Sequence, residues 1–158
     1  MKHGSTRRWL GLTAWLAVTF VAAGVGSQFQ PGPWYDALSK PAWTPPDWVF
    51  APVWSTLYLL MAVAAWLVWK DDGFAGARLA LGFYLLQLAA NTAWSWVFFG
   101  RQDVGGGLGV IVVLWVLVAV TLPLFWRRDR VAGSLLVPYL LWVSYAGSLN
   151  LQLLRLNG

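Results

Sequence analysis

The side chains of this sequence that could act on a ligand are aromatic rings and amides rather than acids, bases or nucleophiles. Between residues 34 and 58 the chain places four Trp, two Tyr, one Phe and four Pro around three charged residues. Aromatic rings offer large apolar faces, and those of Trp and Tyr also carry a polar edge. This stretch is too aromatic and too rich in proline for an ordinary surface linker, and its residue types favour binding over catalysis.

Conventional catalytic and metal-binding groups are scarce. The sequence has no Cys and no Glu, and it has six Asp and a single His, His3, near the N-terminus. The lack of Cys excludes thiolate catalysis and Cys-ligated metals, and the remaining residues form no cluster with metal-ligand spacing. No acid–base pair or nucleophile is recognisable either. We therefore expect no conventional catalytic residue, no metal and no required cofactor.

The composition is that of a membrane protein. Of the 158 residues, 59% are hydrophobic and 11% are charged. Several apolar runs reach the about 20 residues that a helix needs to cross a hydrocarbon core about 30 Å thick. The runs are continuous rather than alternating, which favours helices over a β-barrel. The net charge of +5 is scattered at the ends of these runs, so we expect no nucleic-acid partner.

The apolar runs predict an all-α membrane protein with a single domain over residues 1–158. We expect a bundle of five transmembrane helices with a structured loop between the first two. The expected helices cover about residues 9–27, 47–69, 79–99, 104–126 and 131–154, and the loop covers about residues 28–46. The first run could instead be a signal peptide, but it is longer than a typical apolar signal region, which favours a retained helix.

The basic residues predict how the bundle is oriented. Lys40, Arg101 and Arg155 fall on one side of the five expected helices, and the other eight Lys and Arg residues fall on the side of the N-terminus. The positive-inside rule then places the N-terminus in the cytoplasm and the C-terminus outside. In a bacterial cell membrane, the aromatic stretch would lie on the outer face.

The start of the second helix carries its own signals. Thr44 is expected to be the N-cap, with Pro45 and Pro46 in the first turn and Asp47 facing the helix dipole. Pro52 follows, and it should either kink this helix or mark its true start.

Polar and aromatic residues recur along one face of the third and fifth expected helices. These stripes comprise Asn91, Trp94 and Phe98 in the third helix, and Trp142, Ala146 and Asn150 in the fifth. Because the second helix runs in the opposite direction, its first half lies at the same depth, with Trp48, Phe50, Trp54 and Tyr58. The convergence predicts a pocket with apolar walls and a few orienting polar groups, with the loop as its lid.

The same residues could instead have a purely structural role, and this alternative to a ligand pocket stays open. Trp and Tyr commonly form belts at membrane interfaces, and amides such as Asn91, Asn150 and Gln87 commonly join helices by hydrogen bonds. Such bonds contribute about 0.6 kcal/mol each on average.

Short segments along the whole chain match a known family in order. They are Trp34-Tyr35, Lys40-Pro41-x-Trp43-x-Pro45-Pro46-x-Trp48-Val49-Phe50, Trp54-x-Thr56-Leu57-Tyr58, Gln87-Leu88-Ala89-x-Asn91-x-x-Trp94, Phe98-Phe99-Gly100, Pro138-Tyr139-Leu140-x-Trp142, Leu149-Asn150 and Arg155-x-Asn157. The most specific part is the Trp-x-Pro-Pro-x-Trp segment that begins at Trp43. These segments resemble the tryptophan-rich sensory and translocator proteins, the TspO/MBR family.

The resemblance implies a five-helix bundle, often dimeric, with a cavity under the loop after the first helix. In the family this cavity binds porphyrins, other tetrapyrroles, isoquinoline- or benzodiazepine-type drugs and, in animal members, cholesterol. The resemblance also implies a link to tetrapyrrole regulation or stress. Combined with the residue pattern, it makes the candidate ligand-binding residues Tyr35, Pro41, Trp43, Trp48, Phe50, Trp54, Tyr58, Asn91, Trp94, Phe98, Trp142, Ala146 and Asn150.

The expected function is that of an integral membrane receptor or carrier for protoporphyrin IX or another tetrapyrrole, present in the lipid bilayer as a homodimer. Lys40 could pair with a propionate of the ligand. One alternative is light- and oxygen-driven degradation of porphyrin, which some family members are reported to perform, with Trp54 and Trp142 as the reactive side chains.

A second alternative is transport of sterols or other lipophiles. The Tyr of the sterol-associated motif of animal members is missing here, where the chain reads Leu149-Asn150-Leu151. Ion-coupled transport is disfavoured because every charge lies near the end of an apolar run or in a loop.

Overall fold

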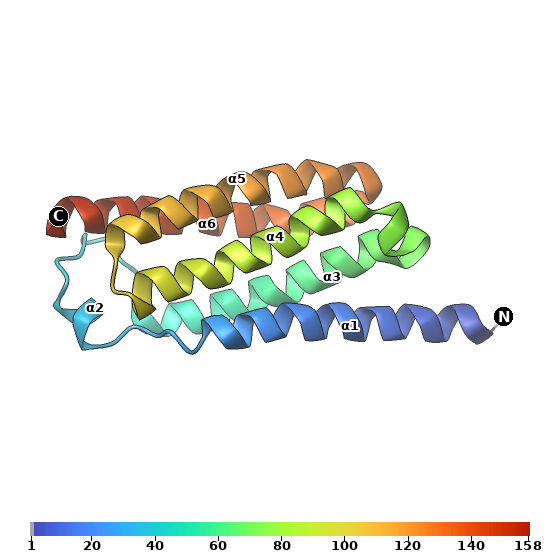
Figure 1. Ribbon diagram of the computed structural model, residues 1–158, viewed down its shortest axis with the longest axis horizontal. Coiled ribbons are helices and arrows are strands. Elements are labelled where there is room, and N and C mark those ends of the chain that lie inside the picture. The colour runs from blue at the N-terminus through green and yellow to red at the C-terminus, as the bar shows by residue number, and fades with distance from the viewer. Residues whose placement is uncertain (1) are drawn as a thin grey trace.

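The computed structural model describes residues 2–158, and every regular element in that range is a helix. Five long helices form an antiparallel bundle (Figure 1), namely α1 (Lys2–Gly26), α3 (Phe50–Gly76), α4 (Arg78–Ser95), α5 (Val104–Arg128) and α6 (Arg130–Asn157). The short α2 (Pro33–Ala37) lies in the connection between α1 and α3, a 3₁₀ turn (Asp47–Val49) leads into α3, and a π-helical turn (Trp96–Gly100) follows α4. The predicted all-α bundle is confirmed.

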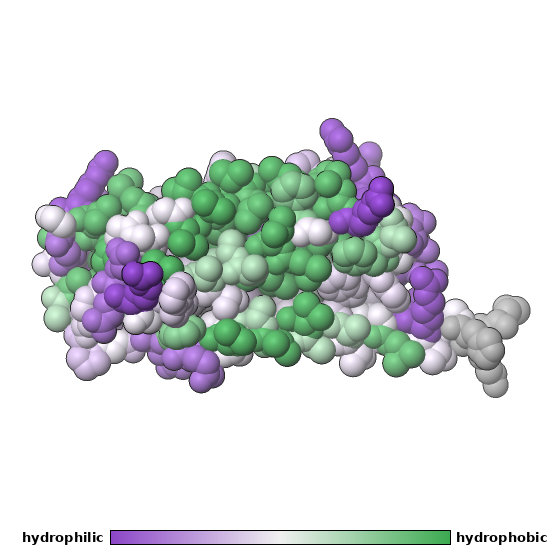
Figure 2. Space-filling model, viewed as in Figure 1, coloured by the Kyte–Doolittle hydropathy of each residue, from purple (hydrophilic) through white to green (hydrophobic). Residues whose placement is uncertain are grey.

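The surface of the bundle suits a bilayer. In Figure 2 hydrophobic side chains form a broad band along the bundle, with hydrophilic side chains mostly at its two ends. Four segments, Gly4–Gly26, Asp47–Gly76, Val104–Arg128 and Arg130–Asn157, are long and apolar enough to cross a membrane. The fifth, α4, is shorter and more polar because it carries buried amides, Gln87 and Asn91, on the face turned to the bundle interior.

The helices extend past the expected spans. α1 begins at Lys2 rather than near residue 9, and α3 continues to Gly76 rather than ending near residue 69. Hydropathy marks only the part of a helix that lies in hydrocarbon, whereas these extensions carry charges. The ion pairs there are Arg8–Asp71 at 3.6 Å, Lys70–Asp129 at 3.7 Å and Arg128–Asp72 at 3.2 Å. They join the ends of α1, α3, α5 and the α5–α6 corner outside the apolar band.

The entry into α3 differs from the expectation at Thr44. Its hydroxyl donates to the carbonyl oxygen of Pro41 at 2.8 Å, and helical structure begins only at Asp47, without a side-chain cap. The prediction of Thr44 as N-cap is wrong because Pro45, which would have to be the first helical residue, precedes Pro46 and is therefore driven out of the helical region. Pro52 lies in the first turn of α3, where no intrahelical N–H is needed, so it marks the helix start rather than a kink.

The centre of the bundle is fastened by Tyr84 of α4. Its hydroxyl shares a 2.6 Å hydrogen bond with Thr19 of α1, and its ring stacks on Phe125 of α5 at 5.8 Å between centroids. Trp15 of α1 meets the same ring edge-on at 5.7 Å. These contacts fix the middle of α1, α4 and α5 against one another.

Candidate ligand-binding cavity

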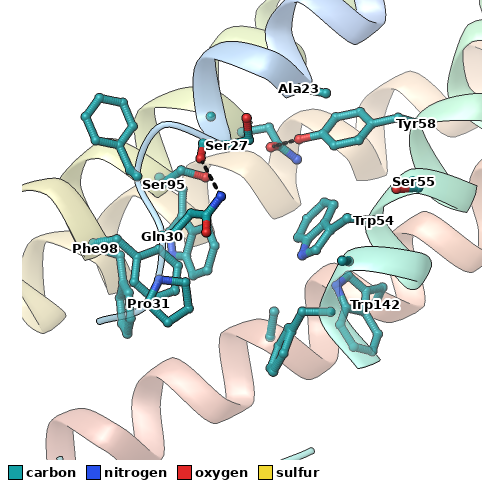
Figure 3. Close-up of a pocket in the computed structure, with 18 of the residues that line it drawn as sticks. Ala23, Ser27, Gln30, Pro31, Trp54, Ser55, Tyr58, Ser95, Phe98 and Trp142 are labelled. Carbon is teal, nitrogen blue, oxygen red and sulfur yellow. Dashed lines mark hydrogen bonds between the residues drawn. The ribbon is translucent and has the colours of Figure 1, made fainter. Parts of the chain in front are cut away.

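A cavity of about 640 Å³ lies at the end of the bundle that carries the α1–α3 connection. Its walls come from α1, this connection, α3, the end of α4 and α6 (Figure 3). Sites for drug-sized ligands measure about 300–1,000 Å³. The cavity therefore has the size of an organic-ligand site.

Two aromatic walls face each other across the cavity in Figure 3. On one side, Trp54 lies 5.7 Å from Tyr58 and 6.4 Å from Trp142 between ring centroids, and its ring is nearly perpendicular to that of Trp142. On the other side, Trp94 stacks on Phe98 at 5.3 Å. Aromatic faces on two sides suit a flat, apolar ligand.

The polar groups of the cavity are largely used by the protein itself. Tyr58 Oη donates to Asn91 Oδ1 at 2.7 Å, and Asn91 Nδ2 donates to Tyr139 Oη at 2.9 Å. Tyr139 then donates to Gln87 Oε1 at 2.7 Å. This chain joins α3, α4 and α6 behind the cavity wall, so Asn91 lines the cavity and also holds the helices together.

Replacing Asn91 by leucine is expected to lower the free energy of unfolding by about 1–3 kcal/mol, because the Tyr58 hydroxyl loses its acceptor and the Tyr139 hydroxyl loses one of its two partners in an apolar interior. Thermal unfolding of the purified protein in detergent measures the change. Gln28→Leu is the matched control, since its amide bonds only to the Gly24 carbonyl at an exposed position. Equal unfolding temperatures for both variants would contradict this role of Asn91.

The side-chain amide of Asn150 is also hydrogen-bonded within the protein. Trp94 Nε1 donates to Asn150 Oδ1 at 3.1 Å, and Asn150 Nδ2 donates to the carbonyl oxygen of Val104 at 2.9 Å. These bonds fix the indole of Trp94 and tie α6 to the start of α5. The interpretation of the two asparagines as links between helices therefore holds alongside their position in the cavity wall.

The indole nitrogen of Trp142 is different. In the part of the chain that the structure describes, it is the one buried side-chain nitrogen or oxygen without a hydrogen-bond partner. A buried donor without an acceptor costs about 1–3 kcal/mol. Trp142 also lines the cavity, so the unused donor belongs to a side chain of the cavity wall, although the nitrogen itself is buried.

Most of the residues predicted to contact a ligand lie in the cavity wall. They are Tyr35, Phe50, Trp54, Tyr58, Asn91, Trp94, Phe98, Trp142, Ala146 and Asn150. The structure brings them together from the connection and three helices, at one depth, as the sequence pattern predicts. Their contact with a ligand stays a prediction.

Three predicted residues, Pro41, Trp43 and Trp48, lie outside the cavity wall. Trp48 is 74% exposed. In a 3₁₀ turn the side chains at positions i and i+3 lie on the same face, so Asp47 and Phe50 share the face toward the cavity and Trp48 points elsewhere. Trp43 packs instead on Tyr145 of α6, with ring centroids 5.6 Å apart.

The cavity also has wall residues that sequence reasoning missed. Small side chains of α1 and α3 line it, together with the segment after α1 and with Asp47; these residues are Ala23, Ser27, Phe29, Gln30, Pro31, Asp47, Ala51 and Ser55. The spacing of Ala23 and Ser27, and of Ala51 and Ser55, is four residues, which places each pair on one helix face. This four-residue spacing of small residues is the sequence pattern that could have predicted these wall residues.

The connection over the cavity is fastened to α6 at two points. Ser39 N donates to Asn157 Oδ1 at 2.9 Å, and Asn157 Nδ2 donates back to Ser39 O at 2.9 Å. Tyr145 Oη donates to the carbonyl oxygen of Trp43 at 2.8 Å. Tyr35 of the same connection lines the cavity with Asn91 and Trp142, so this segment is positioned as a lid would be.

Lys40 contacts the protein next to the cavity rather than in its wall. Its Nζ donates to the carbonyl oxygens of Asp36 at 3.2 Å and Leu38 at 3.4 Å, and it lies 4.6 Å from the centre of the Tyr35 ring. It is not a wall residue. Two backbone carbonyls and an aromatic face hold the ammonium, and its pairing with a ligand propionate stays a prediction.

A bundle of long apolar helices with an aromatic cavity at one end defines an integral membrane protein with room for a small molecule. The model of the TspO/MBR family matches residues 12–156, and the chain belongs to this family. It is therefore a membrane protein of the tryptophan-rich sensory and translocator type.

The relatives cover nearly the whole chain. The chain is 46% identical to Protein CrtK of Rhodobacter capsulatus over 149 residues, which is 89% of this chain and 91% of that protein. It is 43% identical to the Tryptophan-rich sensory protein of Cereibacter sphaeroides, over 94% of this chain and 92% of that protein. It is 39% identical to the Translocator protein of Homo sapiens, over 80% and 78%.

Proposed function

We propose that this protein is a membrane receptor or carrier that binds porphyrins or related tetrapyrroles in the cavity under the α1–α3 connection. The observation that carries the proposal is the pair of aromatic walls, Trp54 with Trp142 and Trp94 with Phe98, on two sides of about 640 Å³. A flat macrocycle can stack on such walls with its faces shielded from water.

The unpaired indole N–H of Trp142 also supports a ligand in the cavity. Its buried N–H has no acceptor within the described residues, and an acceptor atom on a bound ligand would satisfy it. One directional bond to an otherwise apolar molecule fixes its orientation, which is how largely hydrophobic sites achieve specificity. Pyrrole nitrogens and side-chain carbonyls of tetrapyrroles are acceptors of this kind.

Titration with protoporphyrin IX tests the proposal. Binding followed by porphyrin absorbance is expected to saturate, and Trp142→Phe, which keeps a ring but removes the donor, is expected to weaken it about three- to tenfold. Unsaturable uptake that equals partitioning into protein-free detergent would overturn the proposal. Unchanged affinity in Trp142→Phe would remove Trp142 from the site.

The proposal also includes the orientation of the protein in the membrane and its oligomeric state. Arg7, Lys70, Arg78, Arg127 and Arg130 are among the basic residues at the end opposite the cavity, which supports a cytoplasmic N-terminus and a cavity near the outer face. A bacterial cell membrane and a homodimer remain expectations from the family. The relatives' names, sensory and translocator, leave open whether the bound ligand is sensed or moved, and flux through liposomes separates the two.

A further inference from the structure

The only charged wall residue of the cavity, among the residues described, is an acid. Asp47 begins the 3₁₀ turn before α3 and lines the cavity with Tyr35 and Phe50. The other wall residues are apolar, aromatic, hydroxyl or amide side chains. A ligand that enters the cavity therefore meets one formal charge, and that charge is negative.

No cationic side chain neutralises Asp47 in the described part of the chain. The ion pairs there all lie at the opposite end of the bundle and use Asp71, Asp72 and Asp129. Asp47 is an exposed residue, so it lies at the rim of the cavity that it lines.

The cations at the same end of the molecule are directed elsewhere. Lys40 is held by two backbone carbonyls and the ring of Tyr35, and Arg101 lies over the ring of Trp96 at 5.6 Å. Neither lines the cavity, nor does Arg155. A ligand carboxylate at the rim would therefore face Asp47 without a counter-ion.

The negative field reaches the cavity wall. Burial raises the pKa of Tyr35 to about 12, and the carboxylates of Asp47 and Asp36 add to the rise because they oppose a negative phenolate. Tyr35 is itself a wall residue that is 3% exposed. The same repulsion acts on an anionic group that a ligand places on the cavity side of this ring, where Asp47 is a wall residue and Lys40 is not.

We propose that Asp47 sets the charge selectivity of the cavity, so that its preferred ligands are flat macrocycles whose rim-facing edge is neutral or cationic rather than a free carboxylate. The inference rests on the proposed tetrapyrrole site and narrows its ligand class. Esterified, amidated or amine-bearing tetrapyrroles fit this edge, whereas a dicarboxylate must turn its carboxylates away from Asp47 or bind more weakly.

Three probes with the same macrocycle and different side-chain charge test the inference. They are protoporphyrin IX, its dimethyl ester, and its diamide with two alkylamine arms, titrated into the whole protein at low ionic strength. The quantity compared is the affinity ratio of the amine probe to the diacid. Dividing the ratio of a variant by that of the wild type cancels the different partitioning of the probes into detergent.

Asp47→Asn is expected to lower this ratio about three- to tenfold, because removal of one charge near an exposed rim changes the interaction with each charged arm modestly. The affinity for the dimethyl ester should stay within about twofold of wild type, since a neutral probe feels no net Coulomb force. Raising the salt concentration to about 1 M should shrink the difference between wild type and variant, because the Debye length falls to about 3 Å.

Asp36→Asn is the matched control. It removes the same charge from the same connection, but Asp36 is not a wall residue. Its ratio is expected to fall less than that of Asp47→Asn, because Asp36 acts on the wall residue Tyr35 more weakly than Asp47 does.

A ratio that is the same in Asp47→Asn and wild type, with all three probes binding saturably, overturns the inference and leaves the proposed function standing. An equal drop in Asp36→Asn also overturns it, because the charge of the whole connection would then be responsible. Failure of all three probes to bind overturns the proposed function, and the inference with it.

Discussion

Trp54→Ala is expected to weaken porphyrin binding about thirtyfold or more, since truncating a large aromatic side chain at the centre of a buried site typically removes about 2 kcal/mol or more. Trp54 projects into the cavity in Figure 3, and its ring contacts Tyr58, Tyr139 and Trp142. The change removes the apolar face at the meeting point of α3 and α6. Titration followed by porphyrin absorbance measures the effect without interference from the other tryptophans.

Trp48→Ala is the matched control for this prediction. It deletes the same side chain from the same entry into α3, but Trp48 is 74% exposed and does not line the cavity. Affinity within about twofold of wild type is expected, because contacts outside the desolvated centre of a site contribute little. An equal loss in both variants would place the ligand on the outer surface of the connection rather than in the cavity.

Gly133→Ala is expected to lower the free energy of unfolding by about 2–3 kcal/mol, because it forces extra volume into a packed corner. Gly133 lies in the first turn of α6, directly after the corner with α5. An added Cβ would lie 2.7 Å from the Cα and 2.8 Å from the Cβ of Trp126. Backbone cannot rotate out of the way as a side chain can, so the two helices must separate.

Thermal unfolding in detergent measures this change, with Gly109→Ala as control. A Cβ at Gly109, which also lies inside a helix, meets nothing within 4 Å. There the substitution is expected to raise stability by about 0.5–1 kcal/mol, the usual gain of Ala over Gly in a helix. If the Gly133→Ala protein unfolds at or above the wild-type temperature, the tight packing of the α5–α6 corner around Gly133 is contradicted.

The sequence by itself determined the class, the helices and the aromatic and amide part of the cavity wall. Continuous apolar runs leave the backbone no option but helices in a bilayer. The regular recurrence of Asn91, Trp94 and Phe98 on one face, and of Trp142 and Ala146 on another, follows from the period of the α-helix. These properties are local, so neighbouring residues alone define them.

The tertiary structure decided the features that depend on how segments meet. Trp48 and Trp54 are both tryptophans of the expected second helix, but Trp48 lies in the 3₁₀ turn before α3, which breaks the α-helical period and turns its side chain outward. Lys40 donates to backbone carbonyls within its own turn and is not a residue of the cavity wall. Asn91 joins Tyr58 and Tyr139, from helices far apart in the chain. Such pairings depend on the rotation of each helix about its axis, which three-dimensional packing sets.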